Sequence, residues 1–184
     1  VCRYIIVGCR KLHPTYVLPI LAGCMSLKNV NELPAELIYQ PPMTGATATI
    51  MGKMEPRHTA LVGDRIAYIM EIDGKRVPKE RKEEYSETWD TVYPISAGEH
   101  TMTVSYQMAG HYTKPAKISF NAEANKNYQL DFVTDIGTAW FSGDSYADIW
   151  IKDKATDKAV TEVIRTAPPP APQTISYPII INNR

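Results

Sequence analysis

Polar and apolar residues alternate along several short stretches of the chain, which is the pattern of β-strands with one buried face. The clearest alternation covers residues 100–108, where every second residue is one of His100, Met102, Val104, Tyr106 and Met108. Residues 128–133 repeat it, with Tyr128, Leu130 and Phe132 on one face. No long segment shows the period of an amphipathic helix, so we expect an all-β protein.

Turn-forming residues separate these stretches at regular intervals. Asp73-Gly74 suits a tight hairpin turn, because both central residues of such a turn need positive φ. We predict strands over residues 46–51, 65–73, 89–95, 100–108, 117–122, 128–133, 146–151 and 159–164. Strands of this length and spacing predict a single antiparallel β-sandwich, immunoglobulin-like or transthyretin-like, over residues 44–166.

The period-two placement of large apolar residues predicts which side chains form the core. We expect the core to contain Ile66, Tyr68, Met70, Val104, Tyr106, Ile118, Phe120, Leu130, Phe132 and Ile149. Trp89 and Trp150 lie inside predicted strands, so we expect them in the core as well.

The N-terminal segment has the anatomy of a secretory signal. Basic residues precede a short apolar stretch that ends in Leu21-Ala22-Gly23-Cys24, and this motif resembles the lipobox of bacterial lipoproteins. The resemblance implies that residues 1–23 are a lipoprotein signal peptide, cleaved after Gly23, and that Cys24 carries the lipid. Several acyl chains anchor a protein stably where one chain does not. An ordinary cleaved signal, an uncleaved anchor and a buried N-terminal segment remain as alternatives.

The two ends of the predicted sandwich differ in character. Residues 24–43 are polar and contain prolines, so we expect a tether that holds the domain away from the membrane. Residues 167–184 begin with a proline-rich stretch and continue into the apolar segment Ile175–Ile181. This segment either completes a sheet edge of the same chain, which we favour, or is a strand donated to a partner. Pro178 restricts it to an edge or a bulge.

Charge content bears on the class of partner, and cysteine content bears on disulfides and free thiols. Lys and Arg together number 20, and Asp and Glu also number 20, so the chain has no basic excess and we expect no nucleic-acid partner. Cys2 and Cys9 lie in the predicted signal and Cys24 is the predicted lipid site. A mature domain without further cysteines would have neither a disulfide nor a free thiol.

The titratable residues do not form a recognisable metal site. No two of the histidines, among them His100 and His111, have the spacing of a metal pair, and we expect His100 to be a strand-edge or half-buried residue rather than a ligand. Asp144, Asp148, Asp153 and Asp157 are close in sequence, and oxygen-rich loops can bind calcium. We favour turn-forming aspartates with solvated carboxylates and predict no metal.

An aromatic pair and several serines are the remaining candidates for chemistry. Trp140-Phe141 lies in a loop-like stretch and is a candidate binding platform for a sugar or a protein, although a plug at one end of the core is favoured. Ser96, Ser119, Ser142 and Ser145 match no nucleophile motif. We therefore predict no catalytic residue, no cofactor and no enzymatic activity, although a convergent triad is not detectable from sequence.

Several motifs resemble those of small bacterial β-sandwich lipoproteins of unassigned function. They are Ile72-Asp73-Gly74-Lys75, residues 96–104, residues 118–124, Asn125-Lys126-Asn127-Tyr128 and Ile151-Lys152-Asp153. The Gly98-Glu99-His100 strand opening also looks like that of PEGA-type surface domains. The resemblance covers residues 46–163. It implies a fold and an envelope location, with Met25 after the cysteine favouring the outer membrane, and it implies no catalytic residues.

These observations lead to one expected function and two alternatives. We expect an envelope lipoprotein, lipid-anchored at Cys24 and facing the periplasm or the surface, whose non-catalytic sandwich binds a protein or glycan. The first alternative is a metal-dependent or glycan-active enzyme that uses the region from Asp144 to Asp157. The second is a structural subunit of an envelope assembly that donates Ile175–Ile181 to a partner.

Overall fold

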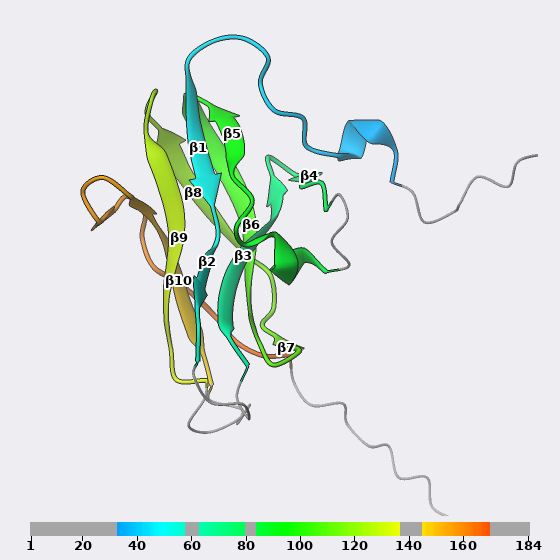
Figure 1. Ribbon diagram of the computed structural model, residues 1–184, viewed down its shortest axis with the longest axis vertical. Coiled ribbons are helices and arrows are strands. Elements are labelled where there is room, and N and C mark those ends of the chain that lie inside the picture. Colours follow the sequence, from blue (N-terminus) through cyan, green and yellow to red (C-terminus); the bar gives the residue numbers. More distant parts are fainter. Residues whose placement is uncertain (1–32, 58–62, 80–83, 137–144, 170–184) are drawn as a thin grey trace, which may run out of the picture. The chain divides into compact units, whose positions relative to one another are not determined.

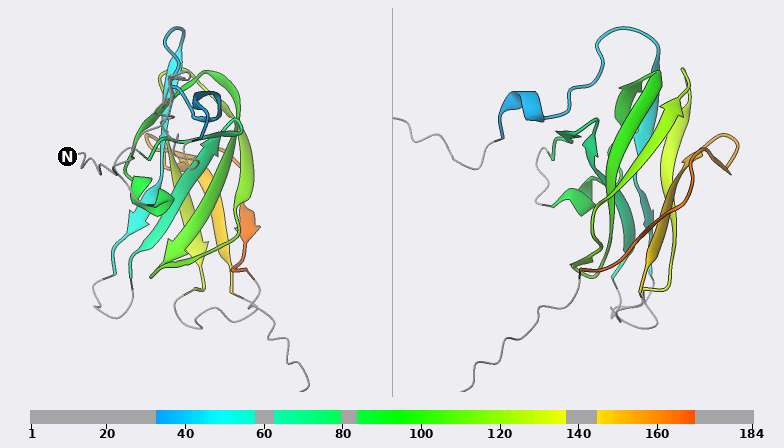
Figure 2. Two further views of the ribbon diagram at one scale, coloured as in Figure 1. Left: turned by 90° about the vertical axis from the view of Figure 1, so that its right-hand side faces the viewer. Right: turned by 180° about the vertical axis from the view of Figure 1, so that it is seen from behind.

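The computed structural model describes residues 33–57, 63–79, 84–136 and 145–169, which all belong to the compact unit Leu33–Arg184. They form two six-stranded sheets that enclose one apolar core, so the protein is an all-β sandwich (Figure 1). The two layers are seen from the side and from behind in Figure 2. Helix is limited, in these ranges, to two short 3-10 turns, η1 (Ala35–Leu37) and η2 (Tyr85–Thr88).

The first sheet contains the strand order β11-β10-β9-β1-β5, and β12 also pairs with β10. Its strands are β1 (Thr47–Met51), β5 (Tyr93–Ser96), β9 (Asn127–Thr134), β10 (Ala147–Asp153), β11 (Lys158–Ala159) and β12 (Ile164–Thr166). All these pairs are antiparallel except β1 with β9, which is parallel. The sandwich is therefore mostly antiparallel rather than wholly so.

The second sheet is built around the long strand β6. It contains the order β2-β3-β6-β7, while β4 also pairs with β3 and β8 also pairs with β6. Its strands are β2 (Lys53–Glu55), β3 (Arg65–Ile72), β4 (Lys75–Arg76), β6 (Gly98–Met108), β7 (His111–Tyr112) and β8 (Ala116–Ala122). The predicted hairpin after β3 is confirmed, because Asp73 has φ 53° and Gly74 has φ 76° in the turn to β4.

One continuous extended segment takes part in both sheets. β1 belongs to the first sheet and β2 to the second, and Gly52 alone separates them. A Cβ atom at position 52 would lie 2.5 Å from the Ala67 carbonyl oxygen and 2.9 Å from the Trp89 backbone. The crossing therefore requires glycine, because the neighbouring backbone leaves no room for a side chain.

The predicted core is confirmed for every strand except β3. Val104, Tyr106, Ile118, Phe120, Leu130, Phe132 and Ile149 all belong to the buried core. In β3 the core residues are instead Ala67, Ile69 and Ile72, while Ile66 and Met70 are half-buried. Tyr68 is buried, yet it lies outside the core cluster. A register shift between Ile69 and Glu71 breaks the period-two pattern on which the prediction rested.

Three smaller predictions about strands were wrong. Trp89 is the C-cap of η2 rather than part of a strand, and β5 begins only at Tyr93. Both Trp89 and Trp150 are half-buried rather than in the core. Residues 159–164 do not form one strand, because β11 ends at Ala159 and β12 begins only at Ile164.

The folded domain begins before the predicted boundary at residue 44. Ile38 forms a parallel bridge with Arg76, and Tyr39 is part of the core with 7% of its surface exposed. Residues 38 and 39 therefore belong to the sandwich, which corrects the last part of the predicted 24–43 tether. Residues 24–32 and the segment Ile175–Ile181 lie outside the described residues.

Candidate functional site

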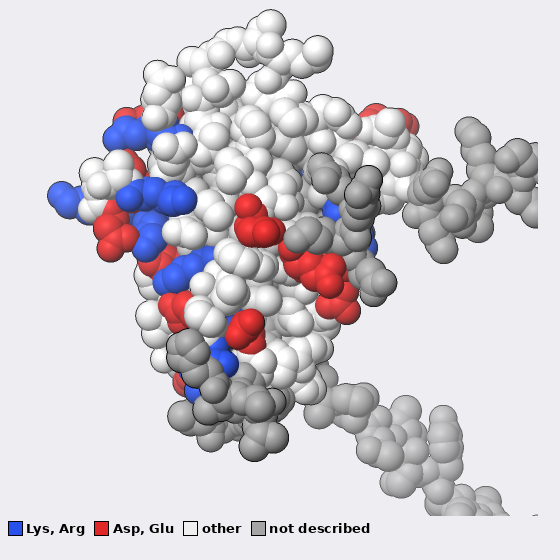
Figure 3. Space-filling model, viewed as in Figure 1, with Lys and Arg blue, Asp and Glu red and all other residues white. Residues whose placement is uncertain are grey.

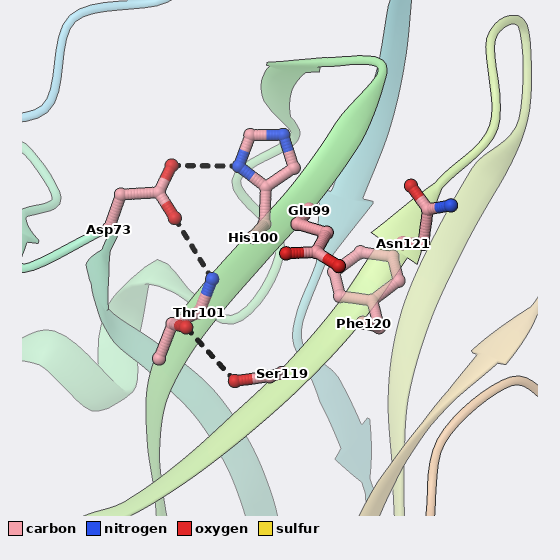
Figure 4. Close-up of a pocket in the computed structure, with 7 residues that line it drawn as sticks. All are labelled: Asp73, Glu99, His100, Thr101, Ser119, Phe120 and Asn121. Carbon is pink, nitrogen blue, oxygen red and sulfur yellow. Dashed lines mark hydrogen bonds and ion pairs between the residues drawn. The ribbon is translucent and has the colours of Figure 1, made fainter.

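A polar hollow of about 430 Å³ opens where β6 and β8 pair, beside the turn between β3 and β4 (Figure 4). It is lined by Asp73, Glu99, His100, Thr101, Ser119, Phe120 and Asn121. The register of the two strands brings these residues together, because Glu99 lies opposite Asn121, His100 opposite Phe120 and Thr101 opposite Ser119. Glu99, Ser119 and Asn121 are exposed, so their polar groups are available to a ligand.

Asp73 holds one wall of the hollow in place. Its Oδ1 atom accepts a hydrogen bond of 2.9 Å from the Thr101 backbone N–H, and its own backbone N–H donates to the Thr101 carbonyl oxygen at 2.8 Å. Its Oδ2 atom lies 2.7 Å from Nδ1 of His100. The positive φ of Asp73 places this carboxylate against β6, and the β3–β4 turn is thereby fixed to the edge of the hollow.

His100 links the two sheets behind the hollow. The sequence predicted a strand-edge or half-buried residue, and His100 is instead buried, with 7% of its surface exposed, near the start of β6. Its Nε2 atom lies 2.8 Å from the Ser96 carbonyl oxygen and 3.2 Å from Ser96 Oγ. Ser96 ends β5 in the first sheet and His100 is near the start of β6 in the second. The ring therefore braces the corner where the chain passes from one sheet to the other.

Asp73, His100 and Ser96 have the order of contacts found in a Ser-His-Asp triad. In such a triad, the imidazole Nε2 accepts the proton of the serine hydroxyl. Here the Ser96 carbonyl oxygen is nearer to Nε2 than the hydroxyl is, and a nitrogen that donates to the carbonyl cannot also act as the base. Ser96 is also absent from the residues that line the hollow. The geometry fits a structural brace better than a nucleophile.

No sequence motif identified this trio. Asp73 and His100 are 27 residues apart, and Ser96 precedes His100 by four. The turn at Asp73-Gly74 and the strand from His100 were both predicted, but their meeting depends on the register between β3 and β6. The sequence features that could have suggested this trio are Asp73 in a tight turn and a histidine, His100, shortly after the Ser96-Ala97-Gly98 turn.

Thr101 and Ser119 give the floor of the hollow a pair of hydroxyl groups, whose oxygens are 2.9 Å apart (Figure 4). Glu99 and Asn121, which lie opposite each other two positions further along the strands, add a carboxylate and an amide. Among the described residues that line the hollow, none is Lys or Arg. The hollow thus offers hydroxyl, amide and carboxylate groups, which together donate and accept hydrogen bonds.

The aspartates considered for calcium are paired with cationic side chains instead. Arg165 donates to Asp148 at 2.8 and 2.7 Å, Lys126 lies 2.9 Å from Asp153, and Lys152 lies 2.6 Å from Asp157. Asp144 lies outside the described residues. Among the residues the structure describes, no group of three or more His, Cys, Asp or Glu side chains is arranged to hold a metal ion.

A chain of alternating charges crosses from β2 to β10 on the outside of the sandwich (Figure 3). Lys53 lies 2.8 Å from Glu55 and 2.5 Å from Asp131. Lys152 lies 2.9 Å from the same Asp131 and 2.6 Å from Asp157. Burial raises the pKa of Asp131, but hydrogen bonds from Lys53 and Lys152 outweigh it and hold the pKa below its ordinary value. These charges satisfy one another, so this surface is a structural network.

The residues of the sequence-based site predictions lie outside the described ranges. They are Leu21, Ala22, Gly23 and Cys24 of the lipobox-like motif and the aromatic pair Trp140 and Phe141. Within the described ranges, none of the helices has the length and apolar character needed to cross a membrane.

Comparison with known proteins identified no relative of this chain. No protein-family model, no curated protein and no solved structure matches the chain.

Proposed function

We propose that this chain is a bacterial envelope lipoprotein, anchored through a lipid on Cys24, whose sandwich binds an envelope glycan without catalysing a reaction. The polar hollow between β6 and β8 carries this proposal. Its volume of about 430 Å³ lies within the usual range for ligand sites. The lipobox-like motif and the resemblance to PEGA-type surface domains support the location.

The lining residues favour a glycan over a protein partner at this hollow. Sugar rings present adjacent hydroxyl groups that both donate and accept, and these pair with the carboxylate of Glu99, the amide of Asn121 and the hydroxyl of Ser119. A protein-binding hot spot would instead centre on a desolvated aromatic or arginine side chain. The aromatic rings in the lining are those of Phe120 and His100, and each residue has only 7% of its surface exposed in the free domain.

Binding to a panel of bacterial cell-wall and surface oligosaccharides tests the hollow. We expect at least one member to bind, and we expect Glu99→Gln and Asn121→Ala each to weaken it about tenfold, the equivalent of 1.4 kcal/mol. Glu162→Gln is the matched control, because Glu162 is exposed and remote in sequence from the hollow. Absence of binding across the panel, or equal binding by all variants, would contradict the proposal.

Metabolic labelling with a clickable fatty acid tests the anchor separately. The wild-type protein should carry the label, and Cys24→Ala should lose it. Cys9→Ala is the matched control and should retain the label, since Cys9 lies within the proposed signal. Label that persists on the Cys24→Ala protein would refute the anchor and leave the glycan site untouched.

The contacts among Asp73, His100 and Ser96 favour one second candidate, a serine hydrolase. A fluorophosphonate probe distinguishes it, because such probes react with activated serine hydroxyls. We expect no labelling, since Nε2 of His100 is nearer to the Ser96 carbonyl than to the hydroxyl. Labelling that Ser96→Ala abolishes would establish the hydrolase instead.

A further inference from the structure

A second concavity lies on the outer face of the other end of the β3–β6 pair. There η2 covers the cross-strand pair of Tyr68 and Ser105, which have 3% and 1% of their surface exposed. The next pair on the same face of the two strands, Ile66 and Gln107, is only half-buried. It forms the floor of a groove of about 480 Å³, and η2 with its caps forms the wall.

The groove combines an apolar floor with an acidic rim. Ile66 and the half-buried indole of Trp89 supply apolar surface, and the exposed side chains of Glu84 and Glu87 supply carboxylates. No Lys or Arg is among the lining residues that the structure describes. Figure 3 shows acidic side chains gathered on the face that carries η2. An occupant with an aliphatic stem and a cationic end would match both parts of the groove.

Two polar side chains of the groove, Glu84 and Gln107, differ in their hydrogen bonding. Glu84 accepts hydrogen bonds from the Tyr112 hydroxyl at 2.5 Å and from Ser86 Oγ at 3.4 Å, which fixes its carboxylate at the rim. The side-chain oxygen of Gln107 is buried and has no hydrogen-bond partner. Amide rotation would let Gln107 meet an N–H group of an occupant, so the floor also favours a hydrogen-bond donor.

We propose that this groove docks an arginine or lysine side chain from a basic segment of a partner protein. The methylene stem packs on Ile66 and on the face of the Trp89 indole, where a cation is also attracted by the ring. The charged end reaches Glu84 and Glu87. The proposal is independent of the Cys24 anchor and of the glycan hollow, because the groove shares no lining residue with that hollow.

Amide chemical shifts of the full chain, titrated with a short Gly-Arg repeat peptide, test the groove. The matched probe is the same peptide with citrulline, which keeps the shape of arginine and removes its charge. We expect the arginine peptide to shift the amides of Ile66, Trp89 and Gln107, and the citrulline peptide to bind at least about tenfold more weakly, the equivalent of 1.4 kcal/mol. Added salt should weaken the arginine complex.

Two variants locate the effect. The double variant Glu84→Gln and Glu87→Gln should weaken the arginine peptide about tenfold, the equivalent of 1.4 kcal/mol. Glu99→Gln, a single substitution of the same type at the other hollow, should leave binding unchanged. Unchanged shifts outside the groove would show that the double variant is folded. No response to millimolar peptide, equal binding of the citrulline peptide, or equal loss in Glu99→Gln would each overturn the proposal.

Discussion

The two open sides of the sandwich are closed by segments from opposite ends of the domain. On one side, the Tyr39 backbone N–H donates to the Arg76 carbonyl of β4 at 2.8 Å, while its hydroxyl donates to the Pro94 carbonyl of β5 at 2.7 Å. We call this the Tyr39 seam. On the other side, the Lys114 N–H donates to the Ala167 carbonyl at 2.9 Å, and Thr166 Oγ1 donates to the Lys114 carbonyl at 2.5 Å. We call this the Thr166 seam.

The two seams differ in what holds them. Tyr39 belongs to the apolar core, so the Tyr39 seam depends mainly on burial of an aromatic ring. The Thr166 seam consists of two hydrogen bonds next to the short strand β12, which pairs with β10. A single intramolecular hydrogen bond contributes about 1 kcal/mol net, whereas deleting a buried aromatic ring costs about 3–5 kcal/mol. We therefore expect the Tyr39 seam to be the stronger.

Tyr39→Ala should give the largest loss of stability. Removing the ring leaves a cavity between the two sheets, so we expect the free energy of unfolding to fall by about 3–5 kcal/mol. Urea denaturation followed by circular dichroism measures it. Met43→Ala is the control, because Met43 is 98% exposed and should change stability little. A loss below about 1 kcal/mol in Tyr39→Ala would mean that residues 38 and 39 dock only weakly.

Thr166→Val should lower the free energy of unfolding by less than Tyr39→Ala does. The substitution keeps the shape and removes the hydroxyl that bonds to the Lys114 carbonyl, so we expect a loss of about 1–2 kcal/mol. Thr156→Val, in the exposed turn between β10 and β11, serves as the control in the same denaturation experiment. If Thr166→Val destabilised the protein as much as Tyr39→Ala, the contrast between the seams would be wrong.

High pH should weaken the Tyr39 seam selectively. Burial, together with the negative charge of Asp73, raises the pKa of Tyr39 from 10.0 to about 12. The folded state thus keeps a proton that the unfolded state loses, and stability falls as the pH rises from 10 to 12. Tyr39→Phe should cost about 1 kcal/mol at neutral pH and should decline less steeply in this window. Equal slopes for the two proteins would exclude Tyr39 as a source of the decline.

Low pH should weaken the Thr166 seam, and this is the smallest of the four expected effects. Hydrogen bonds from Arg165 of β12 hold the pKa of Asp148 in β10 below its ordinary value of 3.8. A carboxylate whose pKa is lowered on folding stabilises the folded state above pH 3.8. This stabilisation is lost as the pH falls through the pKa of the folded state. Hydrogen exchange at the Lys114 amide, measured relative to its intrinsic rate at each pH, should therefore accelerate at low pH. In Asp148→Asn that acceleration should be reduced, and an unchanged profile would contradict the link.

The strands that could be predicted are those whose outer face carries polar residues. β6, β8, β9 and β10 alternate because one face is apolar and the other polar, and their core residues followed directly. The prediction of core residues failed for β3 because η2 covers the outer face of this strand. Tyr68 is therefore buried on the side opposite to Ile69. Two buried faces and a register shift remove the periodicity that distinguishes inside from outside.

The sites were harder to predict than the strands. The hollow depends on cross-strand register, which places Glu99 beside Asn121 although nothing in the local sequence links them. Tyr39 follows a stretch with no period, so its burial could not be inferred from pattern. Its partners Arg76 and Pro94 are set by how the edges of two sheets approach each other, and that approach is a tertiary property.

Gly52 has a mechanical consequence. Because β1 and β2 are one continuous segment, the backbone at Gly52 is a covalent strut between the two layers. Gln129 Nε2 also donates to the Gly52 carbonyl at 3.1 Å, which ties the strut to β9. A shear that slides one sheet across the other must stretch this backbone as well as separate side chains. The sandwich should therefore resist sliding of its layers more than it resists peeling at its edges.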